Sequence, residues 1–440
     1  MKIPAIPGFD QQAFEKYFKN TGWLLFGKVL SLVVGFLIAR YLGPAAFGEL
    51  SFADAFAAIF AAIGTLGLDS FIIREIIQHP EKRDEILGTS LAMRLAANLI
   101  IIPVSLITYL IFHYFSGNPG GNSLAILVSI CASAYLFKSF NIIDSYFQSQ
   151  VNSKYVVWVQ NFCLLFSAVI KIALVYWGAP VIYFAWALVL DSALLAVGLI
   201  WMYQRQQMQL QRWTFNWERG KSLLQQSWPL ILTAVMISIY MKIDQVMLKS
   251  LGSKEVGIYS SAARISESWY FIPVAIVTSV FPAIIHARKT DIERYQKRLQ
   301  NLYDLLVGIS VPVAILISFS ANILIHLLYG EQYAGAGDML SIHIWSGIFV
   351  FLGSASSQYL LAEGYTMISF TRTAVGALVN VLLNLWLIPL YGGWGASVAT
   401  LIAYGVSTFF VLVIPQTRQQ GILMLKSLFF ISIIQKITKR

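Results

Sequence analysis

Charged side chains within long apolar runs are the residues of this sequence most able to do chemistry. Six cations and six acids lie in such runs. The cations are Lys28, Arg94, Lys138, Lys171, Lys242 and Arg264, and the acids are Asp54, Asp69, Asp144, Asp191, Asp244 and Glu267. A charge at membrane depth costs about 2.5–3.5 kcal/mol on insertion scales, so it usually faces a hydrated cavity or an opposite charge. The cations could bind an anionic group, and the carboxylates could bind a proton or Na⁺.

Helical spacing gathers these charges into polar stripes. Lys242 lies four residues after Ser238, and Gln245 and Lys249 continue the same helix face, while Asp244 points elsewhere. Four further stripes are Ser260, Arg264 and Glu267; Asp54, Ala58, Ala61, Thr65 and Asp69; Lys138, Asn141, Asp144, Ser145 and Gln148; and Lys28, Ser31 and Gly35. We expect the stripes to border a hydrated lumen or one another. For any single charge, a lumen role and a structural ion pair, such as Arg264 with Glu267, remain the two alternatives.

The elements that position these charges are predicted to be membrane-spanning helices. The chain is 58% apolar and 12% charged, against about 25% charged in soluble domains. A span needs about 20 mostly apolar residues. We predict an all-α polytopic membrane protein with about twelve spans, and we expect the first run to remain in the mature protein because it lacks the features of a cleavable signal peptide. The runs are 21–40, 46–73, 86–112, 124–147, 155–177, 181–203, 228–250, 257–286, 302–329, 339–362, 366–390 and 394–415.

The distribution of Lys and Arg predicts the orientation. Counted with the termini and loops at or near the span ends, 22 of these residues, Arg372 among them, fall on one side, and 3 fall on the other. The positive-inside rule then places both termini in the cytoplasm. The net charge of +10 therefore reflects membrane topology, and we expect no nucleic-acid partner. The end of the chain, 417–440, is apolar but short, and we expect an amphipathic interfacial tail there rather than a thirteenth span.

An internal repeat predicts the domain organisation. Leu42-Gly43, Gly48, Ser51 and Ala53 recur 209 residues later as Leu251-Gly252, Gly257, Ser260 and Ala262. Both copies join the first two spans of a six-span half. We predict two six-helix lobes, 1–204 and 222–416, joined by a cytoplasmic linker over 205–221. Parallel repeats of this kind occur in transporters, with the substrate site between the repeats.

Motifs of catalysis and of cofactor binding are not evident. The segment from Gly22 to Lys28 has the spacing of a phosphate-binding loop, but Val29 stands where Ser or Thr is needed. Zinc-ligand spacings and a G-x-S-x-G motif are missing, and the five histidines are scattered. We therefore expect no enzyme activity, no metal and no cofactor. Cys131 and Cys163 are expected to be buried apolar residues without a disulfide.

Several short motifs resemble one family. The resembling motifs are Asn20-Thr21-Gly22-Trp23, Ala39-Arg40-Tyr41-Leu42-Gly43-Pro44, Phe47-Gly48, Gly67-Leu68-Asp69 and Arg74-Glu75, followed by Asp244-Gln245, Leu251-Gly252, Val256-Gly257-Ile258-Tyr259-Ser260, Ala263-Arg264-Ile265 and Phe281-Pro282. The first group resembles the N-terminal part of Wzx-type polysaccharide flippases, and the second resembles the start of that family's second lobe. The resemblance implies membership of the multidrug/oligosaccharidyl-lipid/polysaccharide exporter (MOP) superfamily and a MATE-like fold, with two six-helix lobes around a central lumen.

The resemblance also implies a function. Such proteins move undecaprenyl-pyrophosphate-linked oligosaccharides, the repeat units of O-antigen, capsule or exopolysaccharide, from the cytoplasmic to the periplasmic leaflet of the bacterial inner membrane by alternating access. The implied headgroup contacts are Lys28, Lys242 and Arg264, with Lys138, Arg94 and Lys171 as further candidates. The carboxylates that could bind a coupling H⁺ or Na⁺, or pair structurally, are Asp54, Asp244, Glu267, Asp144 and Asp191. Implied partners are the bilayer and the polymerase and glycosyltransferases of the same pathway.

Three alternatives remain beside the flippase. An ion-coupled multidrug or metabolite antiporter of the same superfamily would favour acidic over basic lumen groups. A membrane-embedded glycosyltransferase would need larger outer loops than 113–123 and 330–338. A purely structural assembly partner would not explain the polar stripes.

Overall fold

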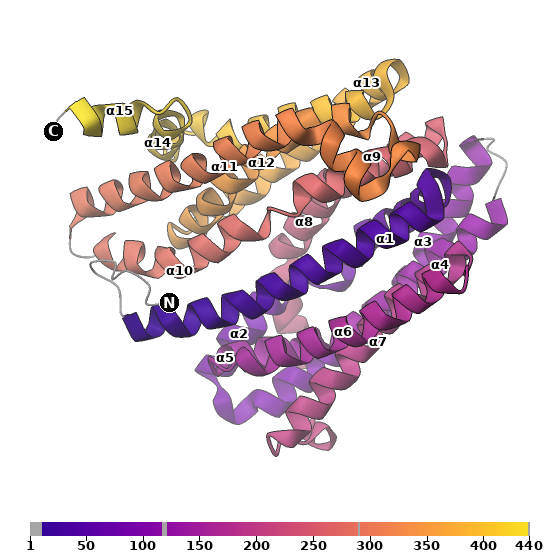
Figure 1. Cartoon of the computed structure of the whole chain (residues 1–440). Helices are drawn as coiled ribbons and strands as arrows, with labels where there is room; N and C mark the ends of the chain where they lie inside the picture. Colours follow the sequence, from indigo (N-terminus) through magenta and orange to yellow (C-terminus); the bar gives the residue numbers. More distant parts are fainter. Residues whose placement is uncertain (1–10, 117–120, 289–290, 439–440) are drawn as a thin grey trace. The chain divides into compact units, whose positions relative to one another are not determined.

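The fold is entirely helical in the part of the chain that the computed structural model describes, residues 11–116, 121–288 and 291–438 (Figure 1). This confirms the predicted fold class. Nine helical stretches of the described residues are long and apolar enough to cross a membrane. The twelve predicted runs are consistent with them. Two of the nine stretches, which contain the long helices α1 (Gln11–Gly64) and α13 (Thr366–Phe409), each hold two runs, and the other seven hold one run each. The remaining run, 257–286, covers α9 (Ser253–Glu267) and α10 (Phe271–Arg288), which are not among the nine.

Two glycines interrupt these long helices. Gly43 in α1 has φ 71° and ψ 167°, and Gly392 in α13 has φ 56° and ψ −138°. A positive φ is available to glycine without a steric cost. Pro44 follows the first break and lacks the N–H that a continuous helix would use. Gly43 and Gly392 therefore interrupt the two long helices between successive runs.

Contacts divide the chain into two compact units. Unit 1 comprises Met1–Leu42 and Phe60–Ile231, and unit 2 comprises Gly43–Ile59 and Leu232–Arg440. The segment 43–59 thus packs with the second half of the chain, and the segment 205–231 packs with the first. The two six-helix lobes, 1–204 and 222–416, stay a prediction.

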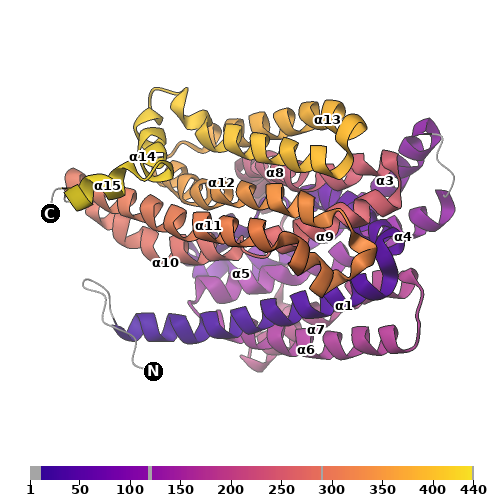
Figure 2. The same cartoon turned by 45° about the horizontal axis from the view of Figure 1, so that its top comes forward.

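Unit 1 is built on five long helices and their short connections. Its elements are the first part of α1, α2 (Asp69–Gln78), η1 (Pro80–Lys82), α3 (Arg83–Ser116), α4 (Gly121–Lys138), η2 (Ser139–Asn141), α5 (Ile142–Ser149), α6 (Lys154–Tyr176), α7 (Val181–Arg205), η3 (Leu210–Arg212) and the start of α8 (Trp217–Met247). Helix α4 packs on α3 and α7, and α6 lies beside α7 (Figures 1 and 2). At one end, Ile72, Ile142 and Tyr203 belong to a buried apolar cluster that also includes Leu223 of α8.

The predicted linker is held firmly against unit 1. The indole of Trp213 donates a hydrogen bond to the Tyr203 hydroxyl at 3.1 Å. The Arg219 guanidinium pairs with Glu85 at 3.1 Å and with Glu75 at 3.2 Å. With Leu223 in the buried cluster, these contacts explain why the first half of α8 belongs to unit 1.

Unit 2 is centred on α12. Its elements are the second part of α1, the rest of α8, η4 (Leu248–Leu251), α9 (Ser253–Glu267), α10 (Phe271–Arg288), α11 (Ile292–Tyr329), η5 (Glu331–Tyr333), α12 (Ala336–Ala362), α13, η6 (Phe410–Leu412), α14 (Arg418–Leu428) and α15 (Ile431–Thr438). Helix α12 contacts α9, α10, α11 and α13. Figure 2 shows α11, α12 and α13 running side by side.

The repeated glycines meet each other within unit 2. A Cβ atom on Gly48 would lie 1.8 Å from the carbonyl oxygen of Ser253, and one on Gly257 would lie 1.9 Å from that of Pro44. Each glycine therefore packs against the backbone where the other copy's helix begins. Gly252, at φ 108° and ψ 161°, also shares the extended, positive-φ conformation of Gly43. The sequence repeat thus has a physical reason: it permits a reciprocal close crossing of two helices.

The C-terminal tail forms two short helices that dock on α11. Helices α14 and α15 have 11 and 8 residues, each shorter than the about 20 residues that a crossing needs. Ser427 donates to the buried Asp304 carboxylate at 2.7 Å, and Gln420 donates to the Tyr303 hydroxyl at 2.7 Å. These polar contacts hold the tail against α11, about a third of the way along that helix.

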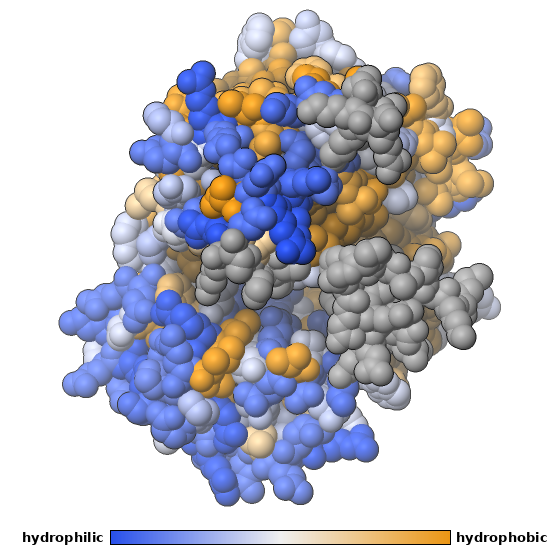
Figure 3. All heavy atoms as spheres, turned by 90° about the vertical axis from the view of Figure 1, so that its left-hand side faces the viewer, coloured by the Kyte–Doolittle hydropathy of each residue, from blue (hydrophilic) through white to orange (hydrophobic). Residues whose placement is uncertain are grey.

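Large apolar side chains cover the outer faces of the long helices. Exposed examples are Leu99, Ile100, Phe162, Val169, Leu316, Phe319, Leu385 and Trp386. One face of the molecule is largely hydrophilic, with hydrophobic residues gathered along its side (Figure 3). Exposed apolar belts of this extent fit contact with lipid. The chain is a multi-pass membrane protein.

Candidate functional site

Three of the six intramembrane cations form ion pairs. The pairs join Arg94 to Asp69 at 2.8 Å, Lys171 to Asp191, and Lys242 to Glu267 at 3.4 Å. Arg94 is buried whereas Asp69 is exposed, so this pair neutralises a buried cation at the rim of unit 1. Glu267 pairs with Lys242 of a neighbouring helix, and not with Arg264 three residues before it on its own helix.

The other three cations, Lys28, Lys138 and Arg264, have no carboxylate oxygen within 4.0 Å in the described part of the chain. The ammonium of Lys138 lies 3.9 Å from the ring centroid of Tyr135, a cation–π contact. Lys28 is exposed, and Arg264 is half-buried. Their positive charges are therefore available to an external anion.

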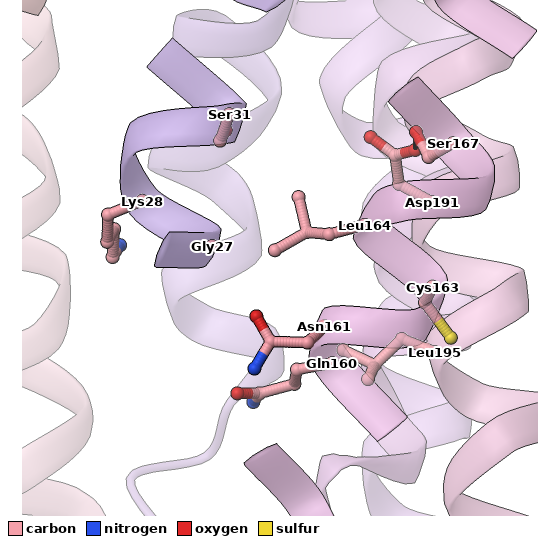
Figure 4. Close-up of a pocket in the computed structure, with 10 residues that line it drawn as sticks. All are labelled: Gly27, Lys28, Ser31, Gln160, Asn161, Cys163, Leu164, Ser167, Asp191 and Leu195. Carbon is pink, nitrogen blue, oxygen red and sulfur yellow. Dashed lines mark hydrogen bonds between the residues drawn. The ribbon is translucent and has the colours of Figure 1, made fainter. Parts of the chain in front are cut away.

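A pocket of about 320 Å³ lies in unit 1 between α1, α6 and α7 (Figure 4). Lys28 and Ser31 of α1 and Asn161 of α6 are among its lining residues, and the Lys28 side chain extends along the side of α1 away from Asn161 (Figure 4). On its far wall Ser167 and Asp191 point toward each other, and the same carboxylate pairs with Lys171 outside the drawn set. The volume falls within the range of small-ligand sites, which is about 300–1,000 Å³. Most of the lining is apolar, and the few polar groups among it, Ser31, Asn161 and Asp191, could orient a ligand.

The close approach of α1 to α6 depends on Gly27. A Cβ atom there would lie 2.7 Å from the amide oxygen of Asn161. The missing side chain lets the Asn161 amide reach the wall of the pocket beside Lys28. The pocket thus combines a cation, amides and a hydroxyl from three helices.

A second charged cluster lies in unit 2 and joins three of the predicted stripes. Lys242 of α8 pairs with Glu267 of α9, and both are roughly a quarter exposed. The exposed Asp54 and the Arg264 guanidinium both lie within electrostatic range of the Lys242 ammonium. Ser238, on the same face of α8, donates to the Ala58 carbonyl at 3.0 Å. The cluster holds two cations and two acids at a partly solvated surface.

Asp244 lies apart from this stripe, as the helical spacing predicts, and it is buried with 3% of its surface exposed. Its carboxylate accepts a hydrogen bond from the Tyr259 hydroxyl at 2.6 Å and others from Asn384 and Thr400. Asn384 also donates to Asn380 at 3.2 Å. In the described residues no cationic side chain pairs with this carboxylate. A carboxylate surrounded by hydroxyl and amide groups can hold a proton or a small hard cation.

The sequence identified Asp244 but missed its neighbours. Tyr259 is on α9, whereas Asn384 and Thr400 are on the two halves of α13. The available signal was Asn380 and Asn384, two amides four residues apart in an apolar run. Asp144, by contrast, is hydrogen-bonded by Gln148 on its own helix and lies in electrostatic range of Asp69.

The remaining sequence-based expectations concern the segment 22–28, the two cysteines and metal ligands. The segment 22–28 lies inside α1, so it is a helix and not a phosphate-binding loop. Cys131 is buried, Cys163 is half-buried, and both are free thiols. In the described ranges, no group of three or more His, Cys, Asp or Glu side chains is arranged to hold a metal ion.

Solved structures define the class of this fold. The chain is similar to the "Lipid II flippase MurJ, inward closed conformation", with a TM-score of 0.72, 16% identity, and 96% of this chain and 93% of that chain covered. It is similar to an inward-facing multidrug resistance MATE family transporter of the MOP superfamily, with a TM-score of 0.71, 16% identity, and coverage of 91% and 96%. The MATE-like fold predicted from the sequence is confirmed.

Sequence comparison then gives the family. The family described as "Polysaccharide biosynthesis protein" matches residues 37–338, so the chain belongs to the polysaccharide biosynthesis protein family. The "Probable flippase AglR" of Haloferax volcanii is 23% identical over 253 residues, which cover 54% of this chain and 50% of AglR. The chain thus matches about half the length of that relative.

Proposed function

We propose that the protein is a flippase that moves an undecaprenyl-pyrophosphate-linked oligosaccharide from the cytoplasmic to the periplasmic leaflet of the bacterial inner membrane. One observation carries the proposal: in a member of the polysaccharide biosynthesis protein family, Lys28, Lys138 and Arg264 lie in predicted membrane-spanning runs without a carboxylate partner in the described residues. A phosphate-bearing substrate would supply the missing negative charge. The family relative named as a probable flippase supports the same reading.

The physical task is the passage of a polar headgroup. Each hydroxyl stripped of water without a partner costs about 4–8 kcal/mol on the cyclohexane scale. A hydrated lumen removes most of this cost, and the polyprenyl tail can stay in lipid. The cations hold the pyrophosphate, and an inside-negative potential favours outward movement of negative charge by about 2.3 kcal/mol per charge per 100 mV.

The transport cycle is alternating access by rocking of the predicted lobes, with both termini in the cytoplasm. The 22-to-3 distribution of Lys and Arg supports this orientation. The reciprocal crossing at Gly48 and Gly257 then lies near the outer side, since each copy follows the end of a lobe's first span. We assign this crossing the role of the outer gate.

The coupling ion, H⁺ or Na⁺, binds at Asp244. Of the five candidate carboxylates, Asp191 and Glu267 already have cationic partners. Asp54 is exposed, and Asp144 is engaged by Gln148. Asp244 is the buried acid whose neighbours are neutral oxygen- and nitrogen-bearing groups. Its neutralisation by Asp244→Asn is expected to abolish the response of transport to an imposed H⁺ or Na⁺ gradient.

Reconstitution tests the proposed function. The purified chain is placed in liposomes with a fluorescent polyprenyl-pyrophosphate-linked oligosaccharide, and dithionite quenching reports the fraction in the outer leaflet. Lys28→Gln and Arg264→Gln are each expected to slow exchange at least about tenfold, whereas Lys82→Gln, which removes an exposed loop cation, should not. Wild-type protein that gives the same rate as empty liposomes would exclude the flippase.

The second candidate is an ion-coupled multidrug or metabolite antiporter. The MATE-like fold and the buried Asp244 favour it. In the same liposomes it would expel a fluorescent organic cation when a Na⁺ or H⁺ gradient is imposed. Drug transport without movement of the lipid-linked glycan would replace the flippase with this function.

A further inference from the structure

Arg372 is a buried cation that the site described above does not include. The charge distribution of the sequence placed it among the loop residues. In the structure it lies inside α13, six residues after the helix begins at Thr366. Only 5% of its surface is exposed. In the described part of the chain, no carboxylate oxygen lies within 4.0 Å of its guanidinium. Its assignment to a solvated loop is therefore wrong, and its charge has no counter-ion.

The contacts of Arg372 use only part of its hydrogen-bonding capacity. Nη2 donates to the Gly353 carbonyl at 3.1 Å and to the Ser357 hydroxyl, both on α12. Nε is buried and has no acceptor. A guanidinium has five N–H donors and stays charged in proteins. A buried charge without a partner is strongly unfavourable, so this arrangement calls for an anion.

Two neutral tyrosines lie near Arg372. Tyr240 and Tyr303 both lie within electrostatic range of the guanidinium. The Tyr303 hydroxyl accepts from Gln420 at 2.7 Å, which leaves its own hydrogen available to donate. A guanidinium beside hydroxyl donors matches the several oxygens of a phosphate group, and the planar fork of arginine suits phosphate in particular.

Glycine leaves room beside the guanidinium. A Cβ atom on Gly353 would lie 3.9 Å from Nη1 of Arg372 and 3.4 Å from the Thr408 hydroxyl, which are ordinary contact distances. A methyl group would therefore fit, and its absence keeps this space open next to the charge. Substitution of Gly353 by alanine fills the space without removing the cation.

The depth of Arg372 indicates the source of the anion. Six residues of α-helix rise about 9 Å, so Arg372 lies near the interfacial zone on the side of the basic loops. Lipid phosphates occupy this zone. We propose that Arg372, with Ser357 and Tyr303, forms a binding site in unit 2 for the phosphate group of a membrane lipid. The phosphate belongs either to a polyprenyl pyrophosphate or to an anionic phospholipid, and the site itself does not depend on the proposed function.

Ligand-induced stabilisation tests this site. The full chain, purified in dodecyl maltoside, is heated with geranylgeranyl pyrophosphate, geranylgeraniol or a short-chain phosphatidylglycerol, and unfolding is followed by intrinsic fluorescence. We expect the wild type to melt at a higher temperature with a phosphate-bearing lipid but not with the alcohol. Stabilisation by the pyrophosphate alone identifies a polyprenyl carrier, and equal stabilisation by phosphatidylglycerol identifies a phospholipid.

Variants separate a binding role from a structural one. Arg372→Met is expected to weaken binding at least tenfold and to melt without ligand at the same or a higher temperature, because an uncompensated charge is removed. Arg288→Met is the matched control, since Arg288 has a partner in Glu363, and its ligand response should stay unchanged. A ligand shift that persists in Arg372→Met, or a wild type that no phosphate lipid stabilises, would overturn the site.

Two further variants cover the case in which Arg372→Met does not fold. Arg372→Lys keeps the charge and should retain part of the affinity, while Gly353→Ala should reduce it by filling the adjacent space. Unchanged affinity in Gly353→Ala would count against the site. Because binding is measured without transport, a protein that binds the phosphate lipid but flips no glycan would refute the proposed function and leave this site standing.

Discussion

Substitution of Gly48 by alanine tests whether the crossing of the two repeat copies acts as a gate. The added Cβ would lie 1.8 Å from the Ser253 carbonyl oxygen, whereas ordinary contacts begin at 3.4 Å. The two helices must therefore separate locally by about 1.6 Å. Overpacking of this kind typically costs about 1–3 kcal/mol. If only the state in which the crossing is formed carries that cost, its population relative to the open state falls by about 5–150-fold.

Chemical labelling measures this shift. Ser260, one turn beyond Gly257, is 5% exposed and is replaced by cysteine in a chain in which Cys131 and Cys163 are alanine. A membrane-impermeant maleimide is then applied from the side opposite the basic loops. We expect slow labelling in the parent and labelling about 5–150-fold faster with Gly48→Ala.

Two comparisons make this result specific. Gly257→Ala should have a similar effect, because its Cβ would lie 1.9 Å from the Pro44 carbonyl oxygen at the same crossing. Gly308→Ala is the matched control, since a Cβ on this glycine of α11 meets nothing within 4 Å. Labelling at the parental rate in a folded Gly48→Ala protein would refute the role of the crossing as a gate.

Three other substitutions test contacts within the units. Arg219→Gln removes both ion pairs that hold the linker to unit 1 and should lower the free energy of unfolding by about 1.5–3 kcal/mol, measured by thermal unfolding in detergent; an unchanged melting temperature would contradict this. Asp304→Ala removes the carboxylate that accepts a hydrogen bond from Ser427 and should release the tail, which limited proteolysis would detect as faster cleavage after α13. A tail that stays resistant to the protease would show that apolar contacts alone hold it. Lys242→Glu should lower the stability of unit 2, and adding Glu267→Lys to the same chain should restore most of the lost stability. A double variant no more stable than Lys242→Glu alone would mean that the ion pair contributes nothing to stability.

The sequence determined the class of the protein and the inventory of its charges. Apolar run length and the one-sided distribution of Lys and Arg are sums over local segments, so they predict spans and topology without knowledge of neighbours, and the misplacement of Arg372 changes one count only. The sequence also contained the repeat at Gly48 and Gly257. A position with no room for a Cβ atom must be glycine, so the same residue stands in both copies. Helical spacing correctly separated Asp244 from the stripe of Lys242.

Tertiary structure alone decided which charges meet. Helical period assigns a residue to a face, but it does not say which other helix lies against that face. The pairing of Glu267 with Lys242, the neighbours of Asp244 from both halves of α13, and the burial of Arg372 without a counter-ion all depend on packing between helices far apart in the chain. The same reason explains why segment 43–59 packs in unit 2: its partners lie about two hundred residues away in the sequence.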